Sequence, residues 1–143
     1  MMVDKEASEY LNSKVNYMTT PTSIGELFDR YNEGERTFTN CDFEFHEYID
    51  NMRLDNCILD CVRFSAAKFY KLSFCGASLK ASVFKNCYFQ NVDFRNANLI
   101  NSDFTGARFK DCLFENTIVD NVQYFNHTLN TEEFIKYLSN THR

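Results

Sequence analysis

Large apolar residues recur at every fifth position through the middle of the chain. The series begins at Leu54 and ends at Val119, and all fourteen of its members are leucine, phenylalanine or valine. A helix of period 3.6 cannot keep such positions on one face, and a flat strand cannot either, because an odd step turns the side chain over. We therefore expect the chain to turn a corner every five residues.

A second series of uncharged and mostly small residues precedes the first by two positions, from Met52 to Thr117. The three other positions of each five carry nearly all the charged and amide side chains. This pattern predicts that one large and one small residue of every five point inward and that the other three face water.

The large positions also repeat with a period of twenty. Aliphatic members lie twenty apart from Leu59 to Val119, and every other member between them is phenylalanine. Four fives then form one coil, and residues twenty apart stack in ladders joined by backbone hydrogen bonds, with about 4.8 Å between coils. The predicted fold class is an all-β solenoid of square cross-section over residues 37–125, a little over four coils.

The same series extends toward the N-terminus with one irregularity. Phe38, Phe43 and Tyr48 continue it if one extra residue, a β-bulge, follows Tyr48. Phe45 and Ile49 compete with them for the inward positions. We expect Tyr48 to point inward.

Individual fives resemble the A(D/N)LXX units of the pentapeptide-repeat proteins. The clearest are ANLIN at 97–101, SDFTG at 102–106 and ASLKA at 77–81. The segment that leads into the repeats is similar to that of bacterial, notably cyanobacterial, members. This resemblance implies a right-handed quadrilateral β-helix.

An open solenoid exposes apolar side chains and strand edges at its ends, so we expect helical caps. Ser23 and Glu26 match a capping box, and Gly34 can end a helix over 23–33. A weaker helical periodicity runs through 5–17.

A second cap signal, beginning at Asn130, predicts a helix at 131–139. This helix either covers the last coil or forms a dimer interface, as a C-terminal element does in gyrase-protecting relatives. The predicted domains are an N-terminal helical cap at 1–36, the β-helix at 37–125 and a C-terminal helical cap at 126–143.

The sequence gives little support for catalysis. His46, His127 and His142 lie in separate regions, and no triad pattern, phosphate-binding glycine loop or HExxH motif accompanies them. The six cysteines lack the paired spacing of a zinc site, and four of them fall on the small inward series. We expect no enzyme activity, no cofactor and no metal.

The net charge of −5 is unevenly distributed. Residues 1–48 contribute −6, residues 49–123 contribute +1 and residues 124–143 contribute 0. The basic excess of the coils is too small to favour nucleic-acid binding. Gyrase-protecting relatives imitate DNA with a strongly acidic solenoid, and a nearly neutral one makes this role the alternative rather than the preferred function.

No apolar run reaches the roughly 18 residues of a membrane span, so no membrane association is expected. Acidic residues within 1–6 occupy the place of a signal-peptide core, which predicts a cytoplasmic protein with reduced cysteines.

We expect a non-enzymatic interaction or scaffold module that binds a protein partner of unknown identity, as a monomer or homodimer. One outer face combines cations and tyrosines suited to an acidic partner. Another carries aliphatic residues that we expect beneath a helix or a second subunit. The candidate partner-binding residues are Lys68, Tyr70, Lys71, Tyr88, Arg108 and Lys110, and the aliphatic ones are Ile58, Ile100 and Ile118.

Overall fold

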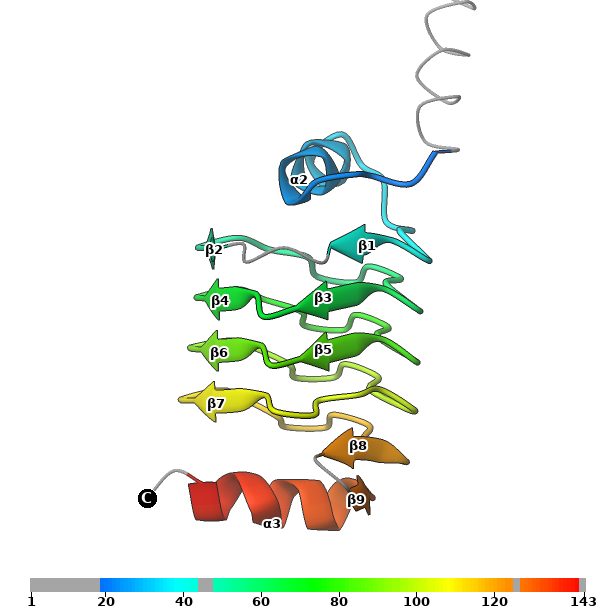
Figure 1. Ribbon diagram of the computed structural model, residues 1–143. Coiled ribbons are helices and arrows are strands. Elements are labelled where there is room, and N and C mark those ends of the chain that lie inside the picture. The colour runs from blue at the N-terminus through cyan, green and yellow to red at the C-terminus, as the bar shows by residue number, and fades with distance from the viewer. Residues whose placement is uncertain (1–18, 44–47, 125–126, 142–143) are drawn as a thin grey trace, which may run out of the picture.

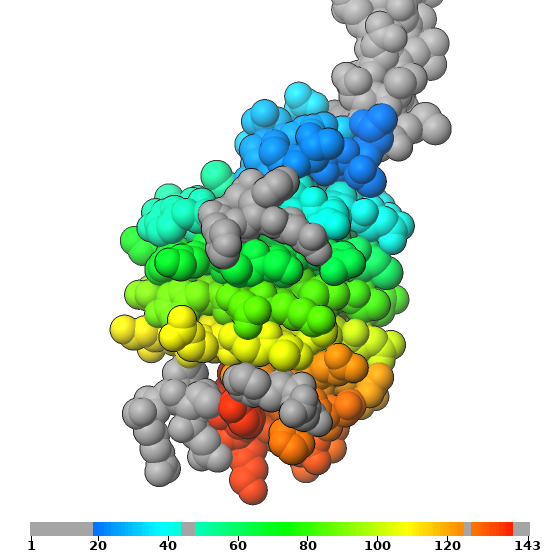
Figure 2. All heavy atoms as spheres, viewed as in Figure 1, coloured from blue at the N-terminus to red at the C-terminus, as the bar shows by residue number. Residues whose placement is uncertain are grey.

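The computed structural model describes residues 19–43, 48–124 and 127–141 of the chain. Short strands and turns form coils that stack into a tower, with helix α2 at one end and helix α3 at the other (Figure 1). Figure 2 shows the coils as closely stacked layers along this tower. The weak helical periodicity at 5–17 lies outside the described residues.

The corners of each coil have a single physical cause. Every fifth residue from Asn51 to Asn121 has a positive φ, between 53° and 73°. Glycine and asparagine tolerate this left-handed conformation best, and most of these corner residues are asparagine or glycine. The left-handed residue turns the chain at each corner, and its regular recurrence produces the five-residue period.

The strands of successive coils pair in parallel with a register of twenty residues, except at the start of the first coil, where Phe43 pairs with Phe64. Phe69 pairs with Phe89, and Phe89 pairs with Phe109. The sheets have the orders β1-β3-β5 and β2-β4-β6-β7, and β8 pairs with β9 antiparallel at the C-terminal end. The strands are β1 (Asp42–Phe43), β2 (Tyr48–Asp50), β3 (Arg63–Ser65), β4 (Lys68–Tyr70), β5 (Val83–Lys85), β6 (Tyr88–Gln90), β7 (Arg108–Lys110), β8 (Val122–Tyr124) and β9 (His127–Leu129).

Columns of stacked phenylalanine rings fill the interior. Phe69, Phe89 and Phe109 form one column, with centroids 4.9 and 5.0 Å apart and planes within 8° of parallel. Neighbouring columns meet edge to face, as Phe84 and Phe89 do at 5.6 Å. Both geometries are favourable for aromatic pairs. The interior is therefore a packed core, and the fold is the right-handed quadrilateral β-helix that the sequence predicts.

The predicted register is wrong in the first coil. Tyr48 is 66% exposed, whereas Ile49 is 3% exposed and pairs with the core residue Phe69. The left-handed corner at Asn51 keeps the five-residue phase from Ile49 onward, so no bulge follows Tyr48. The extra residue lies instead between Phe43 and Ile49, in a segment whose residues 44–47, Phe45 among them, fall outside those described.

Helix α2 (Ile24–Asn32) covers the first coil, as predicted. The Ser23 side chain accepts a hydrogen bond of 3.1 Å from the Glu26 amide, which satisfies one free donor at the helix start. Gly34 follows the helix with φ of 106° and donates to the carbonyl of Tyr31. This geometry ends the helix where the sequence indicates.

Helix α3 (Thr131–Thr141) lies across the last coil (Figure 1) and extends two residues beyond the predicted range. Phe134 is fully buried, with ring centroids 5.8, 5.8 and 5.6 Å from those of Phe104, Phe109 and Phe114. It continues the aromatic interior, so α3 is a cap.

Candidate protein-interaction site

The sheet β2-β4-β6-β7 forms one wall of the tower. Five of the six candidate partner-binding residues lie on its strands, and the sixth, Lys71, is the corner residue that follows β4. We call the outward side chains of these strands, with the corner residues that follow them, the tyrosine wall. Its three ladders are Tyr48, Lys68, Tyr88 and Arg108; Asp50, Tyr70, Gln90 and Lys110; and the corner residues Asn51, Lys71, Asn91 and Asp111.

An aromatic run alternates between the first two ladders of the tyrosine wall. The ring centroids of Tyr48 and Tyr70 are 4.8 Å apart, and those of Tyr70 and Tyr88 are 5.8 Å apart. The Arg108 guanidinium continues the run, with its central carbon 5.7 Å from the Tyr88 ring centroid. Tyr88 also donates a hydrogen bond of 3.1 Å to Gln90. These side chains contact one another and present a continuous apolar and cationic strip.

Tyr48 is the member of this run that sequence reasoning missed. Its neighbour Ile49 lies five positions before Leu54, so strict use of the five-residue period would have placed Ile49 inward and Tyr48 outward.

The cations of the tyrosine wall differ from those elsewhere on the coils. Lys68, Lys71, Arg108 and Lys110 form no ion pair within the described part of the chain. By contrast, cations of the other walls lie within 4 Å of a carboxylate. These pairs are Arg53–Asp55 at 3.1 Å, Lys80–Asp60 at 3.9 Å, Lys85–Asp103 at 3.7 Å and Arg95–Asp93 at 2.8 Å.

The ion pair between Arg95 and Asp93, on another wall, also changes the pKa of the aspartate. Hydrogen bonds from Arg95 hold the pKa of Asp93 below its ordinary value. On the tyrosine wall the carboxylates, Asp50 and Asp111, occur in the first and last coils of the sheet, and with the four cations they give a net charge of +2. The wall therefore carries positive charge that its own side chains do not neutralise.

The backbone of the tyrosine wall is rigidly held. Lys71 donates to the carbonyl of Gln90 at 3.0 Å, and Asn91 donates to that of Lys110 at 2.9 Å. Directly behind the strands, Phe69 and Phe89 are fully buried. The outward side chains are thus carried by a frame that needs no ordering before it binds.

The three aliphatic candidates do not form one patch. Ile58 and Ile118 occupy the same ladder and are 43% and 50% exposed, but Ser78 and Asn98 separate them. Ile100 is half-buried and lies in the turn that follows Leu99. Neither described helix covers Ile58 or Ile118, and a covering second subunit remains a prediction.

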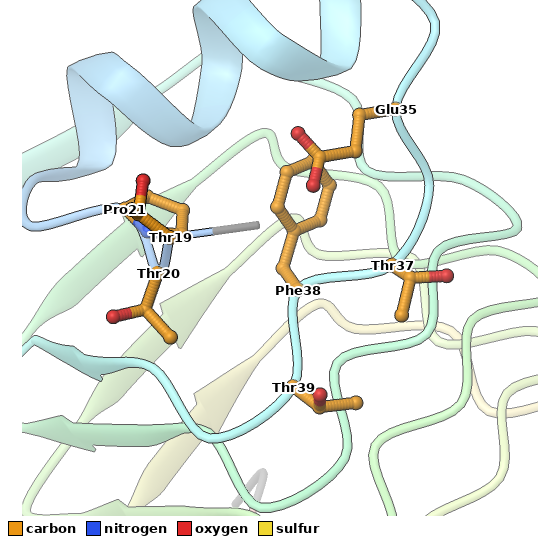
Figure 3. Close-up of a pocket in the computed structure, with 7 residues that line it drawn as sticks. All are labelled: Thr19, Thr20, Pro21, Glu35, Thr37, Phe38 and Thr39. Atoms are coloured by element: carbon orange, nitrogen blue, oxygen red, sulfur yellow. The ribbon is translucent and has the colours of Figure 1, made fainter. Parts of the chain in front are cut away.

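Surface hollows lie near the α2 end of the tower. One of about 240 Å³ is lined by residues 19–21, before α2, and by Glu35 and residues 37–39, after it (Figure 3). Its one ionisable side chain is Glu35, whose pKa burial raises above the ordinary value and whose Oε2 lies 3.8 Å from Arg30. Another, of about 400 Å³, borders the tyrosine wall at Lys71 and Asn91.

Three of the six cysteines behave as small core residues. Cys41, Cys57 and Cys87 are at most 1% exposed, and burial raises the pKa of the Cys57 and Cys87 thiols to about 12. A thiol held protonated is a poor nucleophile and metal ligand. Within the described residues, no three histidine, cysteine or acidic side chains are grouped so that they could hold a metal ion. No described helix is long and apolar enough to cross a membrane.

A β-solenoid with a packed interior and polar walls belongs to the structural and interaction modules, because its surface is what it offers to other molecules. Residues 47–124, more than half of the chain, match the family described as pentapeptide repeat region, and the chain belongs to that family. No curated protein matches the sequence.

Solved pentapeptide repeat proteins are also similar to the chain. Rfr23 from the cyanobacterium Cyanothece 51142 has 12% identity and a TM-score of 0.43, and the match covers 72% of this chain and 97% of Rfr23. A protein of the Arabidopsis thaliana thylakoid lumen has 18% identity and a TM-score of 0.35, over 77% and 79% of the two chains. HetL from Nostoc, involved in heterocyst differentiation regulation, has 10% identity and a TM-score of 0.25, over 77% and 100%.

Proposed function

We propose that the chain is a non-enzymatic protein-interaction module that docks a protein partner on its tyrosine wall. The observation that carries this proposal is that one wall combines a surface tyrosine run, in which Tyr48 is exposed and Tyr70 and Tyr88 are partly exposed, with four cations that have no ion-pair partner in the described chain. Tyrosine and arginine are among the residues that contribute most to binding at protein interfaces.

The packed interior supports the same function. Phenylalanine columns occupy the space inside the described coils that a ligand or substrate would need. Rigid backbone ladders keep the wall side chains in place, which lowers the entropic cost of association.

The test is selective loss of a captured partner. Tagged wild-type protein and a variant with Lys68→Ala, Tyr70→Ala, Tyr88→Ala and Arg108→Ala are used to capture proteins from the native cells. We expect at least one protein that is retained by the wild type and lost from the variant. If every captured protein survives the four substitutions, the tyrosine wall is not the docking site.

A matched control changes the same number of residues on other walls. The control variant carries Lys80→Ala, Lys85→Ala, Arg95→Ala and Ile118→Ala, all at outward positions. It should retain the partner, and circular dichroism and thermal unfolding show whether both variants are folded.

The cysteines favour a reducing compartment such as the cytoplasm. All six thiols are free. Alkylation of rapidly quenched cells should find them reduced, and an oxidised pair would argue against this location.

The alternative is a DNA-like regulator of gyrase, which would need a strongly acidic surface. The tyrosine wall is instead positive, and the coils are nearly neutral. A supercoiling assay tests this alternative directly, and any inhibition or rescue of gyrase by the purified protein would revive it.

A further inference from the structure

The geometry points to an acidic peptide segment of another protein as the occupant of the tyrosine wall, bound through carboxylates at the cations and an apolar side chain on the tyrosine run. This inference rests on the function proposed above and specifies the chemistry of the partner. The side chains that would recognise the peptide include the tyrosine run and Arg108, whose neighbouring members lie 4.8 to 5.8 Å apart.

Charge complementarity selects the carboxylates. On the other walls four cations are paired with carboxylates of the coils, as Arg95 is with Asp93 at 2.8 Å. Lys68 and Arg108, in one ladder, remain unpaired within the described residues, and so do Lys71 and Lys110. A partner that supplies carboxylates gains ion pairs here without breaking existing ones, whereas on the other walls it would compete with Asp93 or Asp60.

The cations occur in two groups whose spacing defines the ligand. Lys68 and Lys71 belong to the coil of β4, and Arg108 and Lys110 belong to β7, two coils farther along the tower. Two coil spacings are about 10 Å. In an extended peptide, side chains two and four positions apart face the same side, and those four positions apart are separated by about 13 Å. A peptide lying along the tower axis can therefore direct two acidic residues four positions apart toward the two groups, with the residue midway between them facing the coil in between.

The coil between the two groups supplies an apolar contact. Strand β6 carries Tyr88 and Gln90 outward, and Tyr88 lies 5.8 Å from Tyr70 in the coil before it. An apolar residue between two acidic pairs would lie over these rings. The predicted recognition pattern is acidic, acidic, apolar, acidic, acidic.

Side chains must provide the recognition, because the wall backbone is already bonded. The carbonyl oxygens of Gln90 and Lys110 accept hydrogen bonds from the backbone amides of Lys71 and Asn91 in the neighbouring coil, at 3.0 and 2.9 Å. A peptide cannot add to this face as a further strand, so its affinity depends on charge and apolar contact.

Other occupants fit less well. The whole chain carries a net charge of −5 and has a pI of about 5.2. This charge repels an extended polyanion such as nucleic acid, which reaches beyond the wall. A short peptide can stay within about one Debye length, 8 Å, of the cations. A second copy would bring one wall of +2 against another and is repelled as well.

The experiment uses the full chain, labelled with ¹⁵N, and titrates acetyl-Ser-Glu-Glu-Leu-Glu-Glu-Ser-amide in 50 mM salt. We expect saturable shifts of the amide signals on β4, β6 and β7. Replacing the four glutamates by glutamine should weaken binding at least about tenfold, which corresponds to about 1.4 kcal/mol. Replacing the leucine by serine should also weaken it, and 500 mM salt should weaken the parent peptide several-fold.

Two charge-reversal variants locate the contact. Lys68→Glu with Lys110→Glu should reduce affinity at least about tenfold, whereas Lys80→Glu with Lys85→Glu changes the net charge equally but lies on other walls and should change affinity less than about twofold. Equal losses in the two variants, or tighter binding of the oligonucleotide dT8 than of the peptide, would overturn the inference.

Failure here is distinguishable from failure of the proposed function. If a captured partner depends on the tyrosine wall but is not displaced by excess peptide, the wall binds proteins and the acidic-segment inference is wrong. If no captured protein depends on the wall, the proposed function fails first. Displacement of a wall-dependent partner by the peptide, and not by its glutamine form, supports both.

Discussion

The residue at each corner determines how the chain turns. Asparagine and glycine adopt positive φ at low cost, but Ala66 and Ala81 also occupy corners, with φ of 57° and 56°. For alanine the left-handed conformation costs roughly 1–2 kcal/mol, because Cβ crowds the following carbonyl. These positions are local weak points in an otherwise regular series.

Ala81→Asn should stabilise the protein by about 1 kcal/mol. The new side chain would also stand next to Asn101 in a ladder where Asn121 already donates a hydrogen bond of 2.7 Å to Asn101. The free energy of unfolding in urea measures the gain, and an unchanged or lower value would contradict it.

Gly76→Ala is the opposite change and should cost about 1–2 kcal/mol in the free energy of unfolding. Gly76 has φ of 70°, and an added Cβ would collide with Oδ1 of Asn56. Gly25→Ala in α2 is the matched control, since its Cβ would meet nothing closer than Ser23 Oγ at 3.9 Å. Equal losses for the two glycines in urea unfolding would show that the corner conformation is not the cause.

Buried thiols make stability depend on pH above about 9. Burial raises the pKa of Cys87 from 9.0 to about 12, so below pH 9 the thiol is protonated in both states. Between these values the unfolded state releases a proton that the folded state keeps, and stability falls by up to about 1.4 kcal/mol per pH unit.

Between pH 9 and 10.5 the free energy of unfolding should therefore fall less steeply with pH in Cys87→Ala than in the wild type. The difference in slope should correspond to at most about one proton. Cys61→Ala, at an exposed position, is the control and should keep the wild-type slope. Urea unfolding at a series of pH values gives both slopes, and identical slopes for all three proteins would refute the assignment.

At the scale of elements, α3 stabilises the last coil by supplying one ring. Phe134→Ala should reduce the free energy of unfolding by about 3–5 kcal/mol, because it opens a cavity against Phe104, Phe109 and Phe114. The neighbouring Ile135, 47% exposed, is the control, and Ile135→Ala should cost less than about 1 kcal/mol. Comparable losses in urea unfolding would mean that α3 is not a cap.

Sequence reasoning located these elements well where the period was uninterrupted. Both helices, the inward series from Leu54 and the candidate wall follow from spacing and capping patterns. The sequence-based prediction failed at Tyr48, because a single inserted residue can be assigned to either side of a corner. Only the pairing of Ile49 with Phe69 shows which residue of the first coil points inward. That one-position shift also hid a member of the tyrosine run.

For the whole molecule, each coil contacts only its neighbours, so damage should spread from the end where it is introduced. In Phe134→Ala, hydrogen exchange should accelerate first at the amides of Ile118 and Gln123, which bond to Ala97 and Ser102, while the amides of Ser78 and Val83 stay protected. Uniform acceleration across the tower would instead indicate a single cooperative unit. Amide exchange followed by NMR distinguishes the two patterns.

The sequence by itself determined the coil, since a five-residue period of apolar centres and left-handed corner residues is a local property that repeats along the chain. Only the tertiary structure decided which outward side chains meet across coils and which cations remain unpaired. The reason is physical: Tyr48, Tyr70 and Tyr88 lie about twenty residues apart and contact one another only when the coils are stacked in register.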